Sequence, residues 1–128
     1  MRILLDTHAF LWLIVDDPRL SAAARRVFLA RDNEVLLSLA SMWEIAIKVS
    51  LGKLRVGNGA RNTIEREVTR NGLSLLPITE EHIWRVAELP FFHRDPFDRL
   101  LATQALVEGL QVVSSDTSFD AYGVKRIW

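Results

Sequence analysis

The chain has 128 residues, 49% apolar and 25% charged, a composition that predicts one globular domain over residues 1–128 and excludes disordered and fibrous proteins. Sixteen basic residues balance sixteen acidic ones, and the absence of cysteine excludes a disulfide framework, a thiolate metal site and a cysteine nucleophile. The longest apolar run, Ala9 to Val15, is too short to span a bilayer, and the first residues lack a signal-peptide pattern, so we expect a soluble, cytoplasmic protein without membrane contact.

Strands and helices are predicted to alternate along the chain. Short apolar runs indicate the strands, and apolar residues at helical spacing indicate the helices. In chain order we expect a strand at 2–5, a helix at 7–15, a helix from 21, a strand at 34–37, a helix from 41 to 52, a helix at 58–71, a strand at 73–78, a helix at 80–89, a helix at 95–109, a strand at 112–115 and a strand at 124–128. This alternation predicts an α/β sandwich around a mainly parallel sheet.

Local signals mark several of these boundaries. Ser41 and Glu44 have the spacing of a capping box, which predicts a helix that begins there. Pro77 cannot donate a backbone hydrogen bond, so its strand is expected to lie at an edge of the sheet or to end at the proline. Asp95 followed by Pro96 predicts a helix N-cap and the first helical residue after it.

Four acidic residues stand where an apolar stretch leads into a helix: Asp6, Glu44, Asp98 and Asp116. Asp6 and Asp116 directly follow predicted strands, and Glu44 and Asp98 lie in predicted first helical turns. In an open parallel sheet, ligands bind beyond the carboxyl ends of the strands, where loops and helix starts converge. We therefore expect the four side chains to meet at one edge of the sheet.

Carboxylates gathered in this way repel one another unless a cation neutralises them. Hard oxygen ligands suit Mg²⁺ or Mn²⁺, which complete their coordination with water and with phosphate oxygens of a substrate. The chemistry that fits such a site is phosphodiester hydrolysis, in which the metal lowers the pKa of the attacking water.

Helix capping competes with this interpretation for each acid taken alone. Glu44 can also pair with Lys48 one turn later, and Asp98 can complete the cap that Asp95 begins. Capping accepts Ser, Thr or Asn equally well, however, so four acids at four helix starts favour a common site.

Several short motifs occur together in the chain: Asp6-Thr7-His8, Trp43-Glu44 with Lys48, Gly52-Lys53-Leu54, His93-Arg94-Asp95-Pro96-Phe97-Asp98-Arg99 and Ser115-Asp116. Together they resemble the PIN-domain ribonucleases of the VapC toxin type, over essentially the whole chain. The resemblance implies a PIN-like three-layer α/β/α sandwich with a mainly parallel central sheet. It also implies a Mg²⁺- or Mn²⁺-dependent endoribonuclease that is the toxin of a toxin–antitoxin pair, binds a cognate antitoxin protein and forms a homodimer.

The resemblance places the family's catalytic, metal-binding acids on Asp6, Glu44, Asp98 and Asp116. The fourth is the least secure, because that family position varies and Asp120 lies one helical turn after Asp116. Asp95 is a rival of Asp98. We prefer Asp98 because the apolar helix pattern begins directly after it, which leaves Asp95 as the cap.

Neighbours of these acids are candidates for orienting them or the attacking water: Thr7, Ser115, Arg99, His8 and His93. The planar guanidinium of Arg99 suits a phosphate or a carboxylate, although each of these residues can equally make a local structural contact. The histidines lack a partnered acid–base pattern, so no histidine-based nuclease mechanism is expected.

Residues 48–70 hold six basic residues against two acidic ones, whereas residues 80–120 hold three against eight. The basic segment supplies candidate RNA contacts, which would give salt-dependent affinity rather than sequence reading: Lys48, Lys53, Arg55, Arg61, Arg66 and Arg70. Five aromatic residues at helical spacing are expected in the core rather than in base stacking: Trp12, Trp43, Trp84, Phe91 and Phe92. A hydrophobic face that receives an antitoxin helix or a second subunit stays open for some of them.

Two other functions stay open. A catalytically silent PIN-like RNA-binding or assembly protein keeps the fold without cleavage, but all four acids are present here. A phospho-receiver signalling module also uses an acidic magnesium pocket, yet the second predicted strand leads to Ser38 and Glu44, and Lys125 lies within a predicted strand. A dinucleotide-binding enzyme is disfavoured because no G-x-G-x-x-G follows the first strand.

Overall fold

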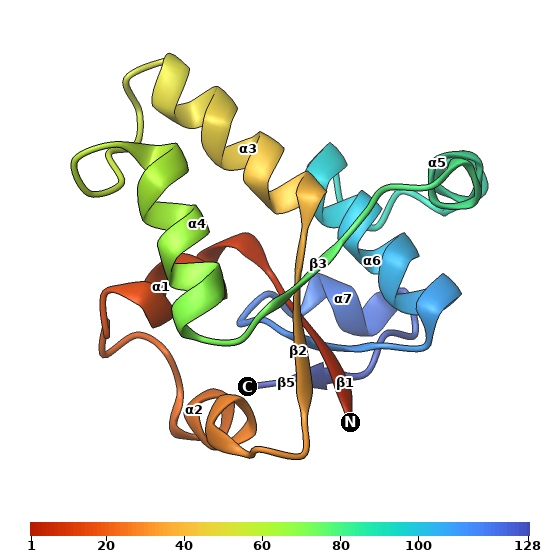
Figure 1. Ribbon diagram of the computed structural model, residues 1–128. Coiled ribbons are helices and arrows are strands. Elements are labelled where there is room, and N and C mark those ends of the chain that lie inside the picture. The colour runs from red at the N-terminus through yellow and green to blue at the C-terminus, as the bar shows by residue number, and fades with distance from the viewer.

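A five-stranded parallel sheet forms the middle layer of the protein, whose computed structural model describes residues 1–128 (Figure 1). Its strands are β1 (Arg2–Leu5), β2 (Glu34–Ser38), β3 (Ser74–Leu76), β4 (Gln111–Val113) and β5 (Arg126–Ile127). The strand order is β3-β2-β1-β4-β5, and every neighbouring pair is parallel. This confirms the expected parallel sheet, and β3, which Pro77 directly follows, lies at an edge as predicted.

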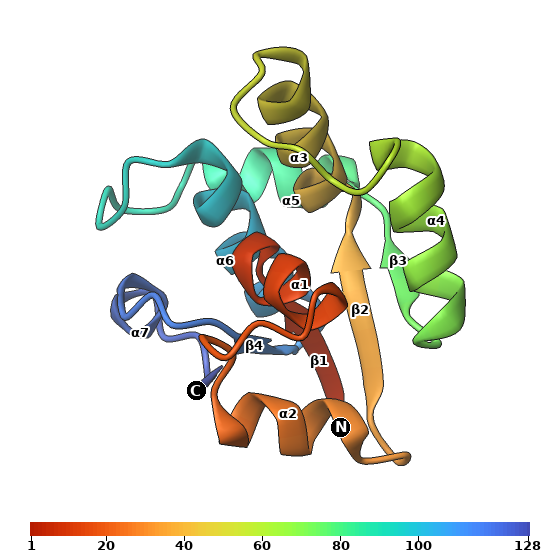
Figure 2. The same cartoon turned by 90° about the vertical axis from the view of Figure 1, so that its left-hand side faces the viewer.

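Seven helices connect and flank the strands: α1 (Thr7–Ile14), α2 (Ala22–Leu29), α3 (Leu39–Ser50), α4 (Ala60–Arg70), α5 (Glu80–Val86), α6 (Pro96–Glu108) and α7 (Ser118–Ala121). Helices α1, α2 and α4 cover one face of the sheet (Figure 2), and α6 and α7 cover the other, with α5 packed on α6. The arrangement is the three-layer α/β/α sandwich. None of the helices has the length and apolar character that a membrane crossing requires.

Alternating side chains of the strands supply both halves of the core. Ile3 and Leu5 of β1 pack toward α1, α2 and α4, whereas Leu4 between them packs toward α6. All three are at most 2% exposed. A parallel sheet covered on both faces needs such continuously apolar strands, and each fully buried side chain of this kind contributes about 1.5–3 kcal/mol.

Helix α3 begins earlier than the predicted capping box implies. Strand β2 ends at Ser38. The Ser38 hydroxyl accepts the Ala40 N–H at 3.0 Å and caps the helix, which therefore starts at Leu39. The prediction of Ser41 as N-cap is therefore wrong: Ser41 is buried within α3. At this junction the strand end itself supplies the cap, and the S-x-x-E spacing is incidental.

Helix α6 begins as predicted. The Asp95 carboxylate accepts the N–H groups of Phe97 at 2.8 Å and Asp98 at 3.2 Å, and Pro96 follows as the first helical residue. Gly109 ends the helix at φ +67°, a left-handed conformation that glycine adopts without strain.

Candidate metal centre

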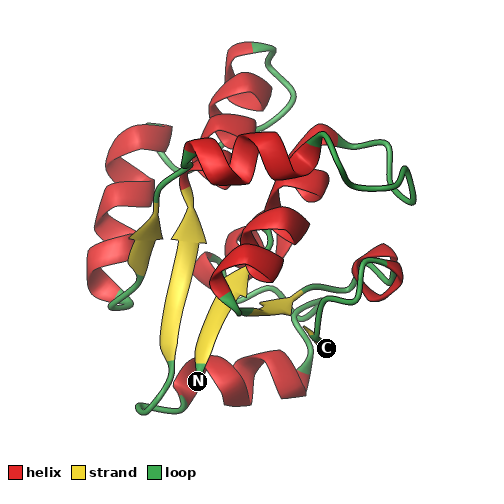
Figure 3. Ribbon diagram, turned by 90° about the vertical axis from the view of Figure 1, so that its right-hand side faces the viewer, coloured by secondary structure: helices red, strands yellow, loops and turns green.

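The predicted acids lie around the carboxyl ends of β1 and β4. These two strands are neighbours in space although β2 and β3 separate them in sequence, so the chain changes direction across the sheet between them. A switch point of this kind opens a crevice where the loops diverge. Asp6 directly follows β1, and Asp116 lies three residues after the end of β4. Figure 3 shows the helices that begin at this end of the longer strands.

Asp6 is both a helix cap and a site residue. Its carboxylate accepts the Ala9 N–H at 2.7 Å, which caps α1, and the residue is only 5% exposed. Burial raises the pKa of Asp6 even though a hydrogen bond from Ser114 and the one from Ala9 oppose it, and the nearby charge of Asp116 raises it further. Capping and membership of an acidic cluster are thus compatible in one side chain.

Glu44 reaches the site from the second turn of α3, not from the first turn as predicted, because the helix begins at Leu39. Both of its carboxylate oxygens are engaged. The Thr7 hydroxyl lies 2.6 Å from Oε1, and the Lys48 ammonium donates to Oε2 at 2.8 Å. Glu44 is 5% exposed, so these two contacts compensate a charge that would otherwise be costly to bury. The predicted alternative, pairing with Lys48, is present in addition to the position near the other acids.

Asp98 is the third residue of α6, as predicted, and it carries the least compensated charge. Burial, assisted by the negative charge of Asp95, raises the pKa of Asp98 to about 7, although His93 opposes this shift. The charges of Glu44 and Asp6 raise it as well. Glu44 and Asp6 therefore lie near enough to Asp98 for their charges to act on it.

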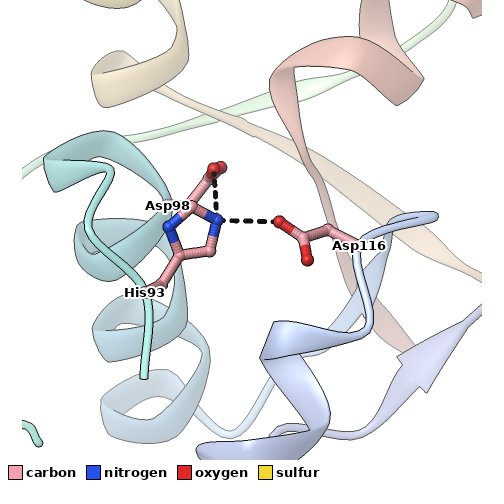
Figure 4. Close-up of side chains that lie close together, drawn as sticks. All are labelled: His93, Asp98 and Asp116. Atoms are coloured by element: carbon pink, nitrogen blue, oxygen red, sulfur yellow. Dashed lines mark hydrogen bonds and ion pairs between the residues drawn. The ribbon is translucent and has the colours of Figure 1, made fainter. Parts of the chain in front are cut away.

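Asp116 completes the group together with His93, a residue from the loop between α5 and α6 (Figure 4). His93 Nε2 lies 2.8 Å from Asp116 Oδ2 and 3.2 Å from Asp98 Oδ2. Burial raises the pKa of Asp116, but hydrogen bonds from Ser118 and His93 outweigh it, so the pKa lies below its usual range. Ligand atoms of His93, Asp98 and Asp116 all fall within 4.8 Å of one another.

A hard divalent cation fits this donor set. The side chains offer carboxylate oxygens, the ligands that Mg²⁺ and Mn²⁺ prefer. Burial, together with the charges of neighbouring acids, raises the pKa of Asp6 and of Asp98, and a cation among them would favour the ionised forms. Asp98 and Asp116 offer oxygen atoms close together, and Glu44 and Asp6 lie near enough for their charges to raise the pKa of Asp98.

The neighbours predicted to assist the acids divide into two groups. Thr7 contacts Glu44 directly, and the charge of His8 lowers the pKa of Asp6 without a hydrogen bond between the two side chains. Ser115 is exposed, and the serine that donates to Asp116 is Ser118 instead.

Arg99 does not contact the acids. It is 5% exposed, and its guanidinium donates to the carbonyls of Pro90, Val86 and Leu89 and to the Tyr122 hydroxyl. Of the two roles left open for Arg99, the structure shows the local structural contact, in which its guanidinium holds the loop after α5.

The rival acids have other partners. The Asp95 carboxylate caps α6, and Asp120 forms an exposed ion pair with Arg126 at 3.0 Å. Neither carboxylate contacts the carboxylate of one of the four acids; Asp95 meets Asp98 only at its backbone N–H.

Four of the six basic candidates line one groove of about 590 Å³ between α1, α3 and α4: Lys48, Lys53, Arg55 and Arg66. Arg19, which had not been predicted, and His8 line it too. Lys48 joins this groove to Glu44 at the acidic site. Arg61 and Arg70 lie outside the groove, next to Glu65 and Glu67 respectively.

Four of the five aromatic side chains predicted in the core are exposed. Trp43 is 58%, Trp84 69%, Phe91 83% and Phe92 56% exposed, and Trp12 is the one of the five that packs against the core. The prediction failed because helical spacing shows that residues share a face, without showing whether another element covers that face.

Two residues lie closer to the acids than their sequence signals indicate: His93 and Ser41. His93, one of several candidate donors in the sequence, contacts two of the acids. Ser41, the predicted cap, has its hydroxyl 3.0 Å from Thr7 Oγ1 beside Glu44. The available signal for His93 was its position in the same short motif as Asp98.

The family model of the PIN domain matches residues 3–125. No curated protein gives a significant match to the sequence.

Among solved structures, the chain is similar to VapBC2 from Rickettsia felis bound to promoter DNA, with TM-score 0.75 and 18% identity over 98% of this chain and 97% of that one. It is similar to DNA-bound VapBC from Salmonella typhimurium, with TM-score 0.72 and 18% identity over 98% and 96% of the two chains. FitAcB from Neisseria gonorrhoeae gives TM-score 0.64 and 20% identity over 97% and 95%. At these identities the likeness concerns the fold.

Proposed function

Because the chain belongs to the PIN-domain family, we propose that it is a Mg²⁺- or Mn²⁺-dependent endoribonuclease that hydrolyses RNA phosphodiester bonds and serves as the toxin of a toxin–antitoxin pair. One observation carries this proposal. Asp6, Glu44, Asp98 and Asp116 act on one another electrostatically at the carboxyl edge of a parallel sheet, and the pKa of Asp98 rises to about 7 there. That is the environment expected of carboxylates arranged to bind a cation.

The residues of the chain have separable tasks in this proposal. A bound divalent ion supplies a water of lowered pKa and neutralises charge on the phosphate. Asp6, Asp98 and Asp116 hold the ion through carboxylate oxygens. Thr7 and Lys48 hold the Glu44 carboxylate in position, since each of its oxygens accepts a hydrogen bond. These fixed carboxylates are in place before substrate binds, which avoids a cost of reorganisation during the reaction.

The groove between α1, α3 and α4 is the proposed approach of the RNA. Its charged lining contains Lys53, Arg55 and Arg66, which are exposed and make no ion pair with an acidic residue. Such side chains suit phosphate groups without distinguishing bases. The groove meets the acidic site at Lys48, so a strand held there would have a phosphodiester near the carboxylates.

The proposed protein partners are a cognate antitoxin and a second copy of the chain. The likeness to the fold of the VapBC structures supports the antitoxin. Exposed apolar side chains on α3, on α5 and in the loop after α5 supply surface for protein contacts, including Trp43, Trp84 and Phe91. Co-purification from the native operon tests for the antitoxin, and sedimentation analysis of the isolated chain tests for the dimer. The proposed location is the cytoplasm.

The decisive experiment measures RNA cleavage by purified wild-type protein and by Asp6→Asn and Asp98→Asn. We expect chelation with EDTA to stop cleavage by the wild type and added Mg²⁺ or Mn²⁺ to restore it, while both variants fold but do not cleave. Cleavage that persists in EDTA or in both variants would contradict the metal-site assignment. A folded wild type that binds RNA without cutting it under any metal condition would support the catalytically silent alternative.

A further inference from the structure

His93 occupies an unusual position between two of the proposed ligands. Its ring lies in the loop between α5 and α6, and Nε2 points at Asp116 Oδ2 and Asp98 Oδ2, at 2.8 and 3.2 Å (Figure 4). Judged by distance alone, His93 would be a third metal ligand beside these two carboxylates. Imidazole is a common ligand of zinc, copper, iron and nickel, whereas Mg²⁺ favours oxygen, so the role of this ring bears on which ions the site accepts.

The other ring nitrogen decides between the two roles. His93 Nδ1 accepts a hydrogen bond from the backbone N–H of Asp95 at 2.9 Å. A nitrogen that accepts a hydrogen bond carries no proton, and in a neutral imidazole the proton then resides on the opposite nitrogen. The backbone contact therefore places the proton on Nε2, where it is donated to Asp116.

The backbone around Asp95 makes this tautomer hard to change. For Nε2 to bind a metal, the proton would have to move to Nδ1, which would place two N–H groups face to face at the Asp95 contact. Asp95 is also the N-cap of α6, with its carboxylate bonded to the N–H groups of Phe97 and Asp98. Rearranging it would disturb the helix turn that carries Asp98 itself.

We propose that His93 is a positioning residue which stays outside the metal coordination sphere and donates its Nε2–H to Asp116, holding this carboxylate next to Asp98. The metal is then bound by oxygen atoms alone. Hydrogen bonds of this kind to ligating carboxylates fix their orientation, and their removal typically weakens metal affinity about 10- to 100-fold. The inference rests on the proposed function, because it presupposes that these carboxylates bind a divalent ion.

The test compares Mn²⁺ affinity, measured by calorimetry without RNA, in the wild type and in three variants. In His93→Ala we expect affinity to fall about 10- to 100-fold, because the donor is absent. In His93→Gln, whose side-chain amide can supply an N–H at a similar reach, we expect most of the affinity to return. Arg94→Gln is the matched control on the same loop: Arg94 is exposed and should leave Mn²⁺ affinity unchanged.

Pulsed electron paramagnetic resonance on Mn²⁺-loaded wild type gives a second measurement that does not depend on how the variants fold. We expect no coupling from a directly bound imidazole nitrogen. Such coupling would overturn the proposal, as would full affinity in His93→Ala or equal losses in His93→Ala and His93→Gln. Absence of Mn²⁺ binding to the folded wild type would instead contradict the proposed function, so the two failures are distinguishable.

Discussion

Asp98 has the least compensated carboxylate among the four acids. Glu44 has Lys48 and Thr7 as partners, and Asp116 has His93 and Ser118. Asp98 has only the longer contact to His93, while burial and three neighbouring carboxylates oppose its ionisation. Differences of this kind between chemically similar side chains assign them different tasks.

The stability of the metal-free protein should consequently fall as pH rises from the ordinary pKa of Asp98 to its pKa in the folded protein. Its pKa is about 7 in the folded protein against 3.8 as the ordinary value, so between these values the native state retains a proton that the unfolded state has released. Unfolding then releases protons, and stability decreases with increasing pH. We expect a loss of about 2 kcal/mol, allowing for solvent screening at this partly exposed group.

Urea denaturation in EDTA across this pH range measures the effect. Asp98→Asn should flatten the dependence, because the amide does not ionise. A variant with the same slope as the wild type would contradict the assignment. Added Mg²⁺ should stabilise the wild type more at the alkaline end of the range, where Asp98 is ionised.

Lys48 is expected to matter for stability as well as for the site. Lys48→Met removes the donor at 2.8 Å from a Glu44 that is 5% exposed, which leaves a buried charge with one hydrogen bond fewer. We expect a loss of about 1–2 kcal/mol, at the lower end for charged pairs because Lys48 is partly solvated. The matched control, Lys53→Met, changes an exposed lysine and should cost within about 0.5 kcal/mol. Equal effects of the two substitutions on the denaturation midpoint would argue against a special role of Lys48.

At the scale of elements, the start of α6 combines a cap with a site residue three positions later. Asp95 accepts two backbone N–H groups there, whereas the Asp98 carboxylate is directed to His93 and the other acids. The sequence motif alone permits either aspartate to be the ligand. The contacts favour Asp98, because one oxygen of Asp95 accepts two backbone N–H groups whereas the Asp98 carboxylate lies beside His93.

Substitution can separate the two tasks. Asp95→Ala should destabilise the fold by about 1 kcal/mol through loss of the cap, and Asp95→Ser should recover most of this because serine also caps helices. Both variants should retain metal-dependent cleavage, whereas Asp98→Ser should not. Thermal melts combined with a cleavage assay measure both effects. Loss of cleavage in the well-folded Asp95→Ser variant would make Asp95 a ligand rather than a cap.

Helices α3 and α5 show which structural features local sequence patterns predict and which they do not. The S-x-x-E spacing placed the start of α3 at Ser41, yet the end of β2 determines it, because Ser38 is already available as a cap. In α5, Trp84 lies 69% exposed, although its apolar character favoured the core. Local patterns specify the type of an element well. They do not specify which neighbours meet it, since those come from elsewhere in the chain.

At the scale of the whole molecule, the candidate acids and the basic side chains lie in two different regions, and Lys48 contacts both. The acids gather where β1 and β4 end, and the groove of α1, α3 and α4 collects Lys53, Arg55 and Arg66. The chain as a whole has a formal net charge of zero. Its overall electrostatics therefore say little about an RNA partner, whereas the folded distribution supplies a local cationic surface.

RNA binding should depend on this groove. We expect the triple change of Lys53, Arg55 and Arg66 to Gln, introduced into Asp6→Asn to prevent cleavage, to weaken binding of single-stranded RNA. The slope of log affinity against log salt should become shallower by about 0.7 for each phosphate group that the variant no longer neutralises. Arg61→Gln is the control, since Arg61 lies outside the groove beside Glu65. Fluorescence anisotropy over a salt series measures the affinity and its salt dependence. If Arg61→Gln weakens RNA binding as much as the triple variant does, the RNA does not bind in this groove.

The sequence by itself determined the alternation of strands and helices, the edge position of β3 and the candidate acids, because periodicity, proline chemistry and capping are local properties. The tertiary structure determined which side chains contact those acids. The order β3-β2-β1-β4-β5 makes β1 and β4 neighbours, and the loop after α5 then brings His93 to Asp116 across 23 residues of sequence. Contacts of this range depend on the packing of whole layers, which single-residue patterns do not encode. The candidate acids could therefore be named from the sequence, whereas the side chains that contact each carboxylate emerged only from the fold.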